Sequence, residues 1–286
     1  MKFLVLGCNG MLGHMVSLYL KEKGHNVTGF AHSKSKFVDC YEADARDLAF
    51  IKEIVERGQY DTIVNCIGIL NQFAENDHES AVFLNSYLPH YLAKITDNMH
   101  TQIIQISTDC VFSGSKGGYK EDDLRDGITF YDRSKGLGEL EDTKNLTLRN
   151  SIIGPDLNVG GIGLMNWFLQ KEGSVRGYSK VIWTGQTTLQ LAKTIEVAAT
   201  KRISGLYHMV PDETISKYDL LQLMNKYIRK NPVEIVCEDK IISNKSLVRT
   251  RFEGFDYQIP DYETMIQELG DWMRTHSELY PHYTIV

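Results

Sequence analysis

The chain alternates short, almost wholly apolar runs with longer segments whose apolar residues recur every three or four positions. The apolar runs lie at 2–7, 25–30, 62–68, 101–107 and 145–151. The segments of helical spacing lie at 11–22, 46–57, 80–97 and 131–144. Continuous apolar runs of this length are typical of parallel strands that are buried on both faces. The alternation predicts an α/β fold, a Rossmann-type doubly wound parallel sheet with ligands at the carboxyl ends of its strands.

The regular alternation ends after residue 151, where the turn-rich stretch "GPDLNVGGIG" begins. A helical pattern returns in "LQLAKTIEVAATKR", which we expect to pack on the main sheet. We therefore predict a Rossmann domain over residues 1–154, completed by about 189–204, and a smaller ligand-binding region over most of 155–286.

Composition excludes several classes of protein. The formal net charge of −6 gives no basic surface for nucleic acid or an anionic membrane. No apolar run approaches the roughly 18 residues of a membrane span, so no membrane insertion is expected and the cytoplasm is the predicted compartment.

Metal and disulfide sites are not predicted. The five cysteines are odd in number and scattered, and they form no C-x-x-C pair. The nine histidines form no H-E-x-x-H motif. We expect reduced thiols and no metal site.

A glycine-rich turn follows the first apolar run, in "LVLGCNGMLGHM". Glycines are needed where a strand turns sharply into a helix and where a pyrophosphate approaches the helix N-terminus. A tight turn without a ligand is the simpler alternative. In an α/β chain this turn favours a dinucleotide, and the predicted contacts are Gly7, Asn9, Gly10, Met11, Leu12 and Gly13.

The end of the second apolar run indicates which dinucleotide binds. NAD enzymes usually place an acidic residue there, but no acid occurs between Thr28 and Val38. The basic and hydroxyl residues His32, Ser33 and Lys34 instead favour the 2′-phosphate of NADPH, with NADH as the alternative cofactor. A solvated basic loop would look the same. Further along, Asp44, followed by Ala45, either binds the adenine or caps the next helix.

The run at 101–107 ends in Ser107-Thr108-Asp109, and Tyr131 and Lys135 open the last helical segment of the first half. Residues four apart share a helix face, so the ammonium is expected to lower the phenol's pKa toward neutrality. Such a tyrosine can protonate a carbonyl oxygen while hydride adds to its carbon, with Thr108 bonded to the same oxygen. Tyr19 and Lys23 repeat the spacing without the hydroxyl-rich strand end.

Together, "GCNGMLG", "STDCVFSG", "YDRSKGLGE" and "GLYHMVPDETISKYDL" resemble the extended short-chain dehydrogenase/reductases. Within them the chain most resembles the reductases of 4-keto-6-deoxy nucleotide sugars, the dTDP-4-dehydrorhamnose reductase family. The resemblance implies that Thr108, Tyr131 and Lys135 are catalytic. It also implies that the glycine turn holds NADPH and that the carboxyl-terminal region holds a nucleotide diphosphate.

The chain departs from the family pattern at three places. Cys110 stands where the family has tyrosine, "GQTT" at 185–188 lacks the usual proline, and "VIW" before it lacks the usual "DQ". These changes leave the reaction type intact but put the sugar nucleotide in doubt. A UDP-linked, N-acetylated 4-keto sugar fits as well as a dTDP-linked one.

Further contacts are predicted on both sides of the site. Cofactor contacts are Cys66, Ile67, Gly68 and Asn85, for which plain strand core, or a bond from Asn85 to a nearby carbonyl, is the alternative. Substrate contacts are Ser107, Asp109, Cys110, Val111, Asn166, Trp167 and Arg176. Trp167 would stack on the base and Arg176 would meet the phosphates, although a core tryptophan and an exposed cation are common.

The function predicted is NADPH-dependent reduction of a nucleotide-linked 4-keto-6-deoxy-hexose to the 4-hydroxy sugar, in a pathway supplying surface polysaccharide. One alternative is an epimerase or dehydratase that retains NAD and uses Asp109 in acid/base chemistry. Another is a non-catalytic, dinucleotide-binding regulatory subunit. A homodimer is compatible with each of these functions.

Overall fold

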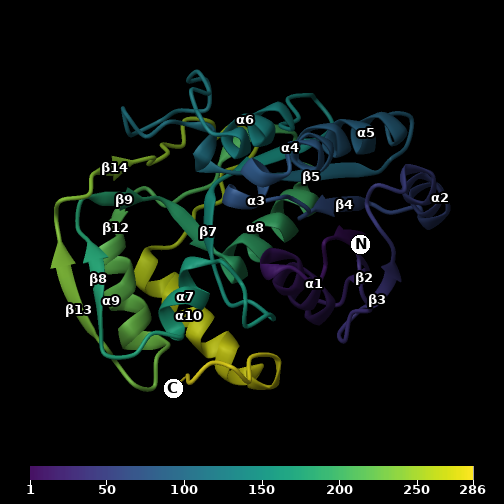
Figure 1. The fold of residues 1–286 in the computed structure, drawn as a ribbon. Helices are drawn as coiled ribbons and strands as arrows, with labels where there is room; N and C mark the ends of the chain where they lie inside the picture. The colour runs from purple at the N-terminus through teal and green to yellow at the C-terminus, as the bar shows by residue number, and fades with distance from the viewer. Residues whose placement is uncertain (286) are drawn as a thin grey trace.

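The computed structural model describes residues 1–285, and its centre is one sheet of seven parallel strands in the order β11-β6-β5-β4-β1-β2-β3. The strands are β1 (Lys2–Leu6), β2 (Asn26–Ala31), β3 (Asp39–Glu42), β4 (Thr62–Asn65), β5 (Gln102–Ser107), β6 (Leu146–Arg149) and β11 (Gly205–His208). The predicted Rossmann-type α/β fold is confirmed (Figure 1).

The strand order reverses beside β1. The chain first builds outward through β2 and β3, and then crosses to β4 on the other side of β1 and continues through β5, β6 and β11. Helices that connect the strands must diverge at this reversal, which leaves a crevice at the carboxyl ends of β1 and β4. The crevice therefore lies beside Leu6 and Asn65, which pair across the two strands.

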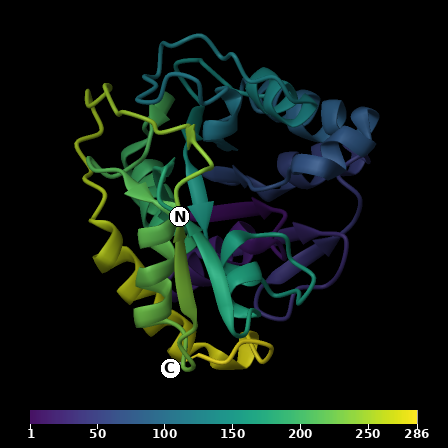
Figure 2. The same ribbon diagram turned by 60° about the vertical axis from the view of Figure 1, so that its left-hand side comes forward.

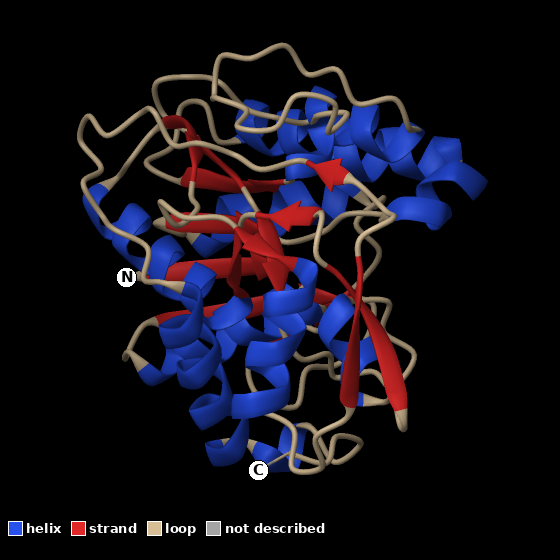
Figure 3. Cartoon of the chain, turned by 90° about the vertical axis from the view of Figure 1, so that its left-hand side faces the viewer, coloured by secondary structure: helices blue, strands red, loops and turns tan. Residues whose placement is uncertain are grey.

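Helices cover both faces of the sheet, because successive residues of a strand point to opposite sides. Phe3 and Val5 belong to one apolar cluster, with α1 (Met11–Glu22) and α8 (Thr188–Lys201). Leu4 and Leu6 belong to the other, with α2 (Leu48–Gly58) and α5 (Leu88–Ile95). Figure 3 shows the strands lying between the two helical layers.

Two predicted helices differ from the structure. The segment predicted at 80–97 is divided into α4 (His78–Ala81), a π-helical turn η1 (Val82–Tyr87) and α5. The segment predicted at 131–144 forms only α6 (Phe130–Leu137), which begins with a capping box between Thr129 and Asp132. The helix ends at Gly138, whose lack of a side chain allows the close approach of the Asn85 carbonyl oxygen.

Helix α3 (Asn71–Asn76) follows β4 in the chain. The carboxyl-terminal region adds several smaller sheets beside the central one. Strand β7 (Ser151–Ile153) pairs with β10 (Gly185–Thr187), and β8 (Ser174–Tyr178) pairs with β13 (Glu234–Glu238). Strand β9 (Val181–Trp183) lies between β12 (Ile215–Ser216) and β14 (Ser243–Asn244). The other elements are α7 (Leu164–Leu169), α9 (Lys217–Tyr227), α10 (Tyr262–Thr275), η2 (Asp109–Val111) and η3 (Ser277–Leu279).

Helices α9 and α10 pack against each other on the far side of the molecule from α5, as Figure 2 shows in green and yellow.

In residues 1–285, no helix combines the length and the apolar character that a membrane crossing requires. The division at residues 154 and 155 stays a prediction.

Candidate active site

A cavity of about 450 Å³ opens at the carboxyl edge of the sheet, where the strand order reverses. It brings together twelve of the residues that the sequence singled out. These are Gly10, Met11, Leu12, Cys66, Ile67, Gly68, Ser107, Thr108, Asp109, Cys110, Tyr131 and Lys135. The glycine turn and the Tyr131/Lys135 pair therefore share one cavity.

The glycine turn has the geometry that a dinucleotide requires. Gly7 has φ +77°, which favours glycine, and a side chain on Gly13 would overlap the Gly7 carbonyl oxygen, so helix α1 can approach the strand closely. Gly10 is the N-cap of α1 and offers no side chain to the first helical amides. These amides remain available to an anion, so the turn fits a pyrophosphate.

The basic loop after β2 is tied to the glycine turn. The Asn9 side-chain amide donates to the carbonyl oxygens of Ser33 at 2.9 Å and Lys34 at 3.3 Å. His32, Ser33 and Lys34 are exposed. Asn9 therefore sets the position of the predicted 2′-phosphate residues relative to the pyrophosphate site. Their role in binding that phosphate stays a prediction.

Asp44 and Ala45 lie just after β3. Asp44 is exposed, and its carboxylate accepts from the Arg46 backbone amide at 2.8 Å, which lowers its pKa. Ala45 is buried. The alternative that Asp44 caps the next helix is wrong, because Asp47 accepts from the Phe50 amide and caps α2. Neither Asp44 nor Ala45 lines the cavity.

The three predicted catalytic residues come from β5 and α6. Thr108 follows the last residue of β5 and caps η2 by accepting from the Cys110 amide at 3.1 Å. Tyr131 and Lys135 lie one turn apart on α6, and both are buried. The Lys135 ammonium donates to the Ile106 carbonyl oxygen at 2.7 Å. All three side chains line the cavity.

The pKa of Tyr131 moves opposite to expectation. Burial raises the pKa of this phenol and outweighs the Thr108 hydroxyl, which lowers it. The Lys135 ammonium donates to the Ile106 carbonyl oxygen, and burial lowers its own pKa to about 8. Tyr131 is therefore protonated at neutral pH, as a proton donor must be.

A buried ionic cluster that the sequence did not reveal supports this edge. The Arg149 guanidinium donates to Glu139 from Nε at 2.8 Å and from Nη2 at 2.6 Å, and both side chains are fully buried. The Ser107 hydroxyl donates to the same carboxylate at 2.5 Å. Burial raises the Glu139 pKa, but Arg149, Ser107 and Arg125 together outweigh it and the pKa is lowered. Ser107 thus already has a partner within the protein.

Asn85 lies in the π-helical turn and is fully buried. Its side chain accepts from the Ile69 amide at 2.8 Å and donates to the Ile69 carbonyl at 2.9 Å and to the Ser134 hydroxyl at 3.1 Å. Asn85 therefore joins α6 to the loop after β4 that carries Gly68. π-Helical turns often occur at functional sites.

Four predicted substrate contacts do not line the cavity. Val111 is buried in a small apolar cluster beside it. Asn166 donates to the Val159 carbonyl and accepts from the Tyr283 hydroxyl, which is a structural arrangement. The Trp167 side chain is 39% exposed, and the Lys171 ammonium lies over its ring. Arg176 belongs to β8, and its guanidinium lies 3.8 Å from the Glu238 carboxylate.

Lys217 lines the cavity although the sequence did not single it out. Burial lowers its pKa to about 8, against the attraction of Asp109. Burial likewise raises the pKa of Asp109, against the attraction of Lys217 and Lys245. The only sequence signal was a lysine within "TISKYDL", where a helix begins.

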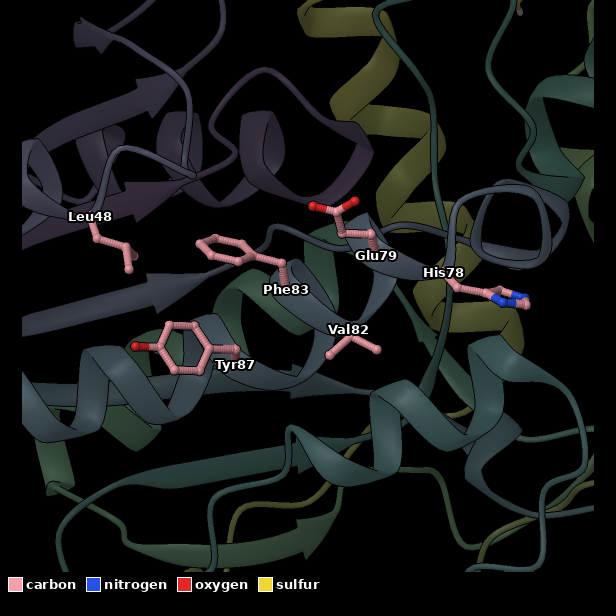
Figure 4. A pocket seen from close by; sticks show the side chains of 6 residues that line it. All are labelled: Leu48, His78, Glu79, Val82, Phe83 and Tyr87. Atoms are coloured by element: carbon pink, nitrogen blue, oxygen red, sulfur yellow. The ribbon is translucent and has the colours of Figure 1, made fainter.

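A separate apolar groove of about 760 Å³ lies on α4 and η1, away from these residues. Figure 4 shows its lining, Leu48, His78, Glu79, Val82, Phe83 and Tyr87, with Leu48 reaching toward it from α2. None of the predicted site residues lines it.

Comparison with known proteins gives a consistent picture. The family model described as the RmlD substrate binding domain matches residues 1–153. The probable low-salt glycan biosynthesis reductase Agl14 of Haloferax volcanii is 35% identical over 139 residues, which cover 47% of this chain and 46% of that protein. The chain thus spans less than half the length of this relative.

Two further proteins match over nearly the whole chain. The dTDP-4-keto-6-deoxy-D-glucose reductase of Streptomyces niveus is 26% identical over 89% of both chains. The solved structure of dTDP-4-dehydrorhamnose reductase from Bacillus anthracis in complex with NADP superposes with a TM-score of 0.80 at 18% identity, covering 96% of this chain and 99% of that one. At this identity the structural match supports the fold alone.

Proposed function

Because the chain belongs to the RmlD substrate binding domain family, we propose that it is an NADPH-dependent reductase of a nucleotide-linked 4-keto-6-deoxy-hexose. The observation that carries the proposal is the shared cavity, in which the glycine turn faces Thr108, Tyr131 and Lys135. The named relative that acts on a dTDP-linked 4-keto-6-deoxy sugar supports the substrate class. The sugar itself is dTDP-linked or a UDP-linked, N-acetylated analogue, and the product serves surface polysaccharide synthesis.

NADPH bound along the glycine turn supplies the hydride that reaches C4 of the sugar. Tyr131 donates its phenolic proton to the C4 oxygen, so the carbonyl gains one hydride and one proton and becomes a hydroxyl. The Thr108 hydroxyl lies beside the phenol and donates to the Asp109 carboxylate at 3.1 Å; with substrate bound it would donate to the C4 oxygen instead. The Lys135 ammonium is fixed by Ile106 and stabilises the negative charge that develops on the Tyr131 oxygen.

The choice of NADPH over NADH rests on the loop after β2. Its exposed residues His32, Ser33 and Lys34 present donors and positive charge, and Asn9 fixes the loop to the glycine turn. An acidic residue that would bind a 2′-hydroxyl and repel a 2′-phosphate does not occur there. The structure of the Bacillus anthracis relative contains NADP, which agrees with this choice.

Asp109 keeps one alternative open, a nucleotide-sugar epimerase or dehydratase that retains NAD. Its carboxyl lines the cavity beside Thr108, and burial raises its pKa, which suits acid/base chemistry. Such an enzyme would be purified with NAD bound. Protein that is free of NAD, or that carries NADP, argues for the reductase.

The test is NADPH oxidation with freshly prepared dTDP- and UDP-linked 4-keto-6-deoxy sugars, with Tyr131→Phe in parallel. Turnover that Tyr131→Phe abolishes supports the reductase, and the preferred nucleotide identifies the pathway. Binding of NADPH without reduction of any of these sugars would contradict the proposal and favour a non-catalytic dinucleotide-binding subunit.

A further inference from the structure

Lys217 enters the catalytic cavity from the carboxyl-terminal region. Strand β12 pairs with β9 in antiparallel register, with Ser216 opposite Ile182. The Ser216 hydroxyl accepts from the Asp219 amide at 3.0 Å and so starts α9, whose first residue is Lys217. The cap and the strand pairing fix the point at which the lysine leaves the backbone, and its side chain reaches the cavity that holds Thr108 and Tyr131.

Stability does not explain a lysine at this position. A cation in the first turn of a helix is repelled by the helix dipole, and burial of an ammonium costs further free energy. Within residues 1–285, the Lys217 ammonium has no hydrogen bond and no ion pair within 4.0 Å. Its identified attractions are the Trp183 ring, 5.0 Å away, and the charge of Asp109.

The charged side chains that line the cavity differ in whether they have hydrogen-bond partners within the protein. Lys135 and Lys217 are its two cations, and Asp109 and Asp156 are its acidic residues. The Lys135 ammonium is bonded to the Ile106 carbonyl, whereas the three N–H donors of Lys217 find no acceptor in the described part of the chain. A ligand that carries negative charge would accept hydrogen bonds from the Lys217 ammonium. Such charge-assisted hydrogen bonds are strong enough to offset the free energy lost when the ammonium is buried.

The residues first expected to meet the phosphates do not reach this cavity. Arg176 is 74% exposed beside Glu238. The proposed substrate carries a diphosphate, so its negative charge needs another cation in the protein.

We propose that Lys217 is a substrate-binding residue whose ammonium holds an anionic oxygen of the sugar nucleotide. That oxygen belongs to a phosphate of the nucleotide diphosphate, because a 4-keto-6-deoxy-hexose has a methyl group at C6 and no carboxylate. Asp109, which is acceptor-only when ionised, then accepts from a hydroxyl of the same sugar. The inference takes its class of substrate, a nucleotide sugar, from the proposed function. It adds that Lys217 is the residue that binds the negative charge of this substrate.

The test measures binding and does not require turnover. Full-length protein saturated with NADP⁺ is titrated calorimetrically with uridine, UDP, dTDP, UDP-glucose and UDP-glucuronate. The variants are Lys217→Met, Lys217→Arg and a matched control, Lys171→Met, whose ammonium also lies over a tryptophan, Trp167, at 5.5 Å but outside the cavity. NADP⁺ affinity and the melting temperature are recorded for each variant.

We expect Lys217→Met to weaken binding of the charged probes by about ten- to a hundredfold, the range of a charge-assisted hydrogen bond. Lys217→Arg should restore part of the affinity, and Lys171→Met, uridine binding and NADP⁺ affinity should not change. An equal loss for UDP and UDP-glucose identifies the phosphate as the bound group.

Two results would overturn the inference. The first is that Lys217→Met binds every charged probe as tightly as the wild-type protein does. The second is that Lys217→Met loses as much affinity for NADP⁺ as for the charged probes, which would indicate general damage to the cavity. Failure of the proposed reductase is distinguishable from both. If no 4-keto sugar is reduced while UDP binding still depends on Lys217, the reaction assignment fails and Lys217 remains an anion-binding residue.

Discussion

The Lys135 ammonium donates a 2.7 Å hydrogen bond to the carbonyl oxygen of Ile106, one residue before β5 ends. Helix α6 is thereby attached to the strand whose next residues are Ser107 and Thr108. Because Tyr131 lies one turn earlier on the same helix, this bond also fixes the phenol relative to Thr108. The geometry of the proposed catalytic residues thus depends on a contact between a side chain and the backbone of the central sheet.

Replacement of Tyr131 by phenylalanine should abolish proton donation and leave the cavity intact. We expect kcat to fall by about 10²- to 10⁴-fold, the usual contribution of a positioned acid, with NADPH affinity unchanged. Steady-state kinetics and a cofactor titration check this. Tyr19→Phe is the matched control, because Tyr19 has the same spacing to Lys23 but donates to Glu196 at 2.8 Å, away from the cavity. A similar loss in both variants would contradict the assignment.

The pH profile should report the lowered pKa of Lys135. Burial moves it from 10.5 to about 8, so the ammonium is present below pH 8 and is lost as the pH rises through that value. We therefore expect kcat at saturating substrate to fall above about pH 8. In Lys135→Arg, which keeps its charge, any remaining activity should not fall there.

Lys217 also has a pKa of about 8, so the profile is repeated in Lys217→Met. A high-pH decline of kcat that persists in this variant belongs to Lys135. A decline that disappears belongs to Lys217 and would contradict the prediction.

Cofactor preference should change when the charge beside Asn9 is reversed. Lys34→Glu would repel a 2′-phosphate and accept from a 2′-hydroxyl, so we expect the ratio of kcat/KM for NADPH to that for NADH to fall at least about tenfold. Lys36→Glu is the control, because Lys36 belongs to the same loop but lines a different hollow beside Lys21 and His25. Equal effects of the two changes would indicate only a general electrostatic influence.

Breaking the buried Glu139–Arg149 pair should be costly. Arg149→Met leaves a carboxylate without its main partner in a site that excludes water, and we expect the free energy of unfolding to fall by about 3–5 kcal/mol. Arg125→Met removes the second, 41% exposed partner of Glu139 and should cost less than about 1 kcal/mol. Chemical denaturation of both variants checks the difference.

The pair also gives a pH dependence of stability. The folded pKa of Glu139 is below its ordinary value of 4.5, so the contribution of Glu139 is complete above about pH 4.5 and is lost as the pH falls through the folded pKa. Wild-type protein should therefore lose more stability between neutral pH and pH 3 than Glu139→Gln does. Parallel acid losses in the two proteins would show that other carboxylates dominate.

The sequence predicted the features that depend on neighbouring residues. The turn at Gly7–Gly13 and the Tyr131/Lys135 pair are local patterns, and the alternation of apolar periods was sufficient for the fold class. The hydroxyl-rich end of β5 was found in the same way.

Features that depend on pairing between distant segments were not predicted. Ser107 reaches the Glu139–Arg149 pair because β5 lies beside β6, with Ser107 opposite Arg149, and Lys217 follows β12, which pairs with β9. The requirement for glycine at position 138 comes from its contact with Asn85, which belongs to a different helical segment. For Trp167 and Arg176, residue type suggested a substrate contact, and the sequence could not show that both lie outside the cavity.

The central sheet is completed by a late part of the chain, and this affects how the protein can be synthesised. Strand β11 and helix α8 supply the last strand and part of the cover over Phe3 and Val5, although about 200 and about 180 residues, respectively, separate them from β1. During translation the first strands emerge well before that cover, so their apolar face remains open to water and to chaperones. The nucleotide-binding half can therefore mature only when most of the polypeptide has left the ribosome.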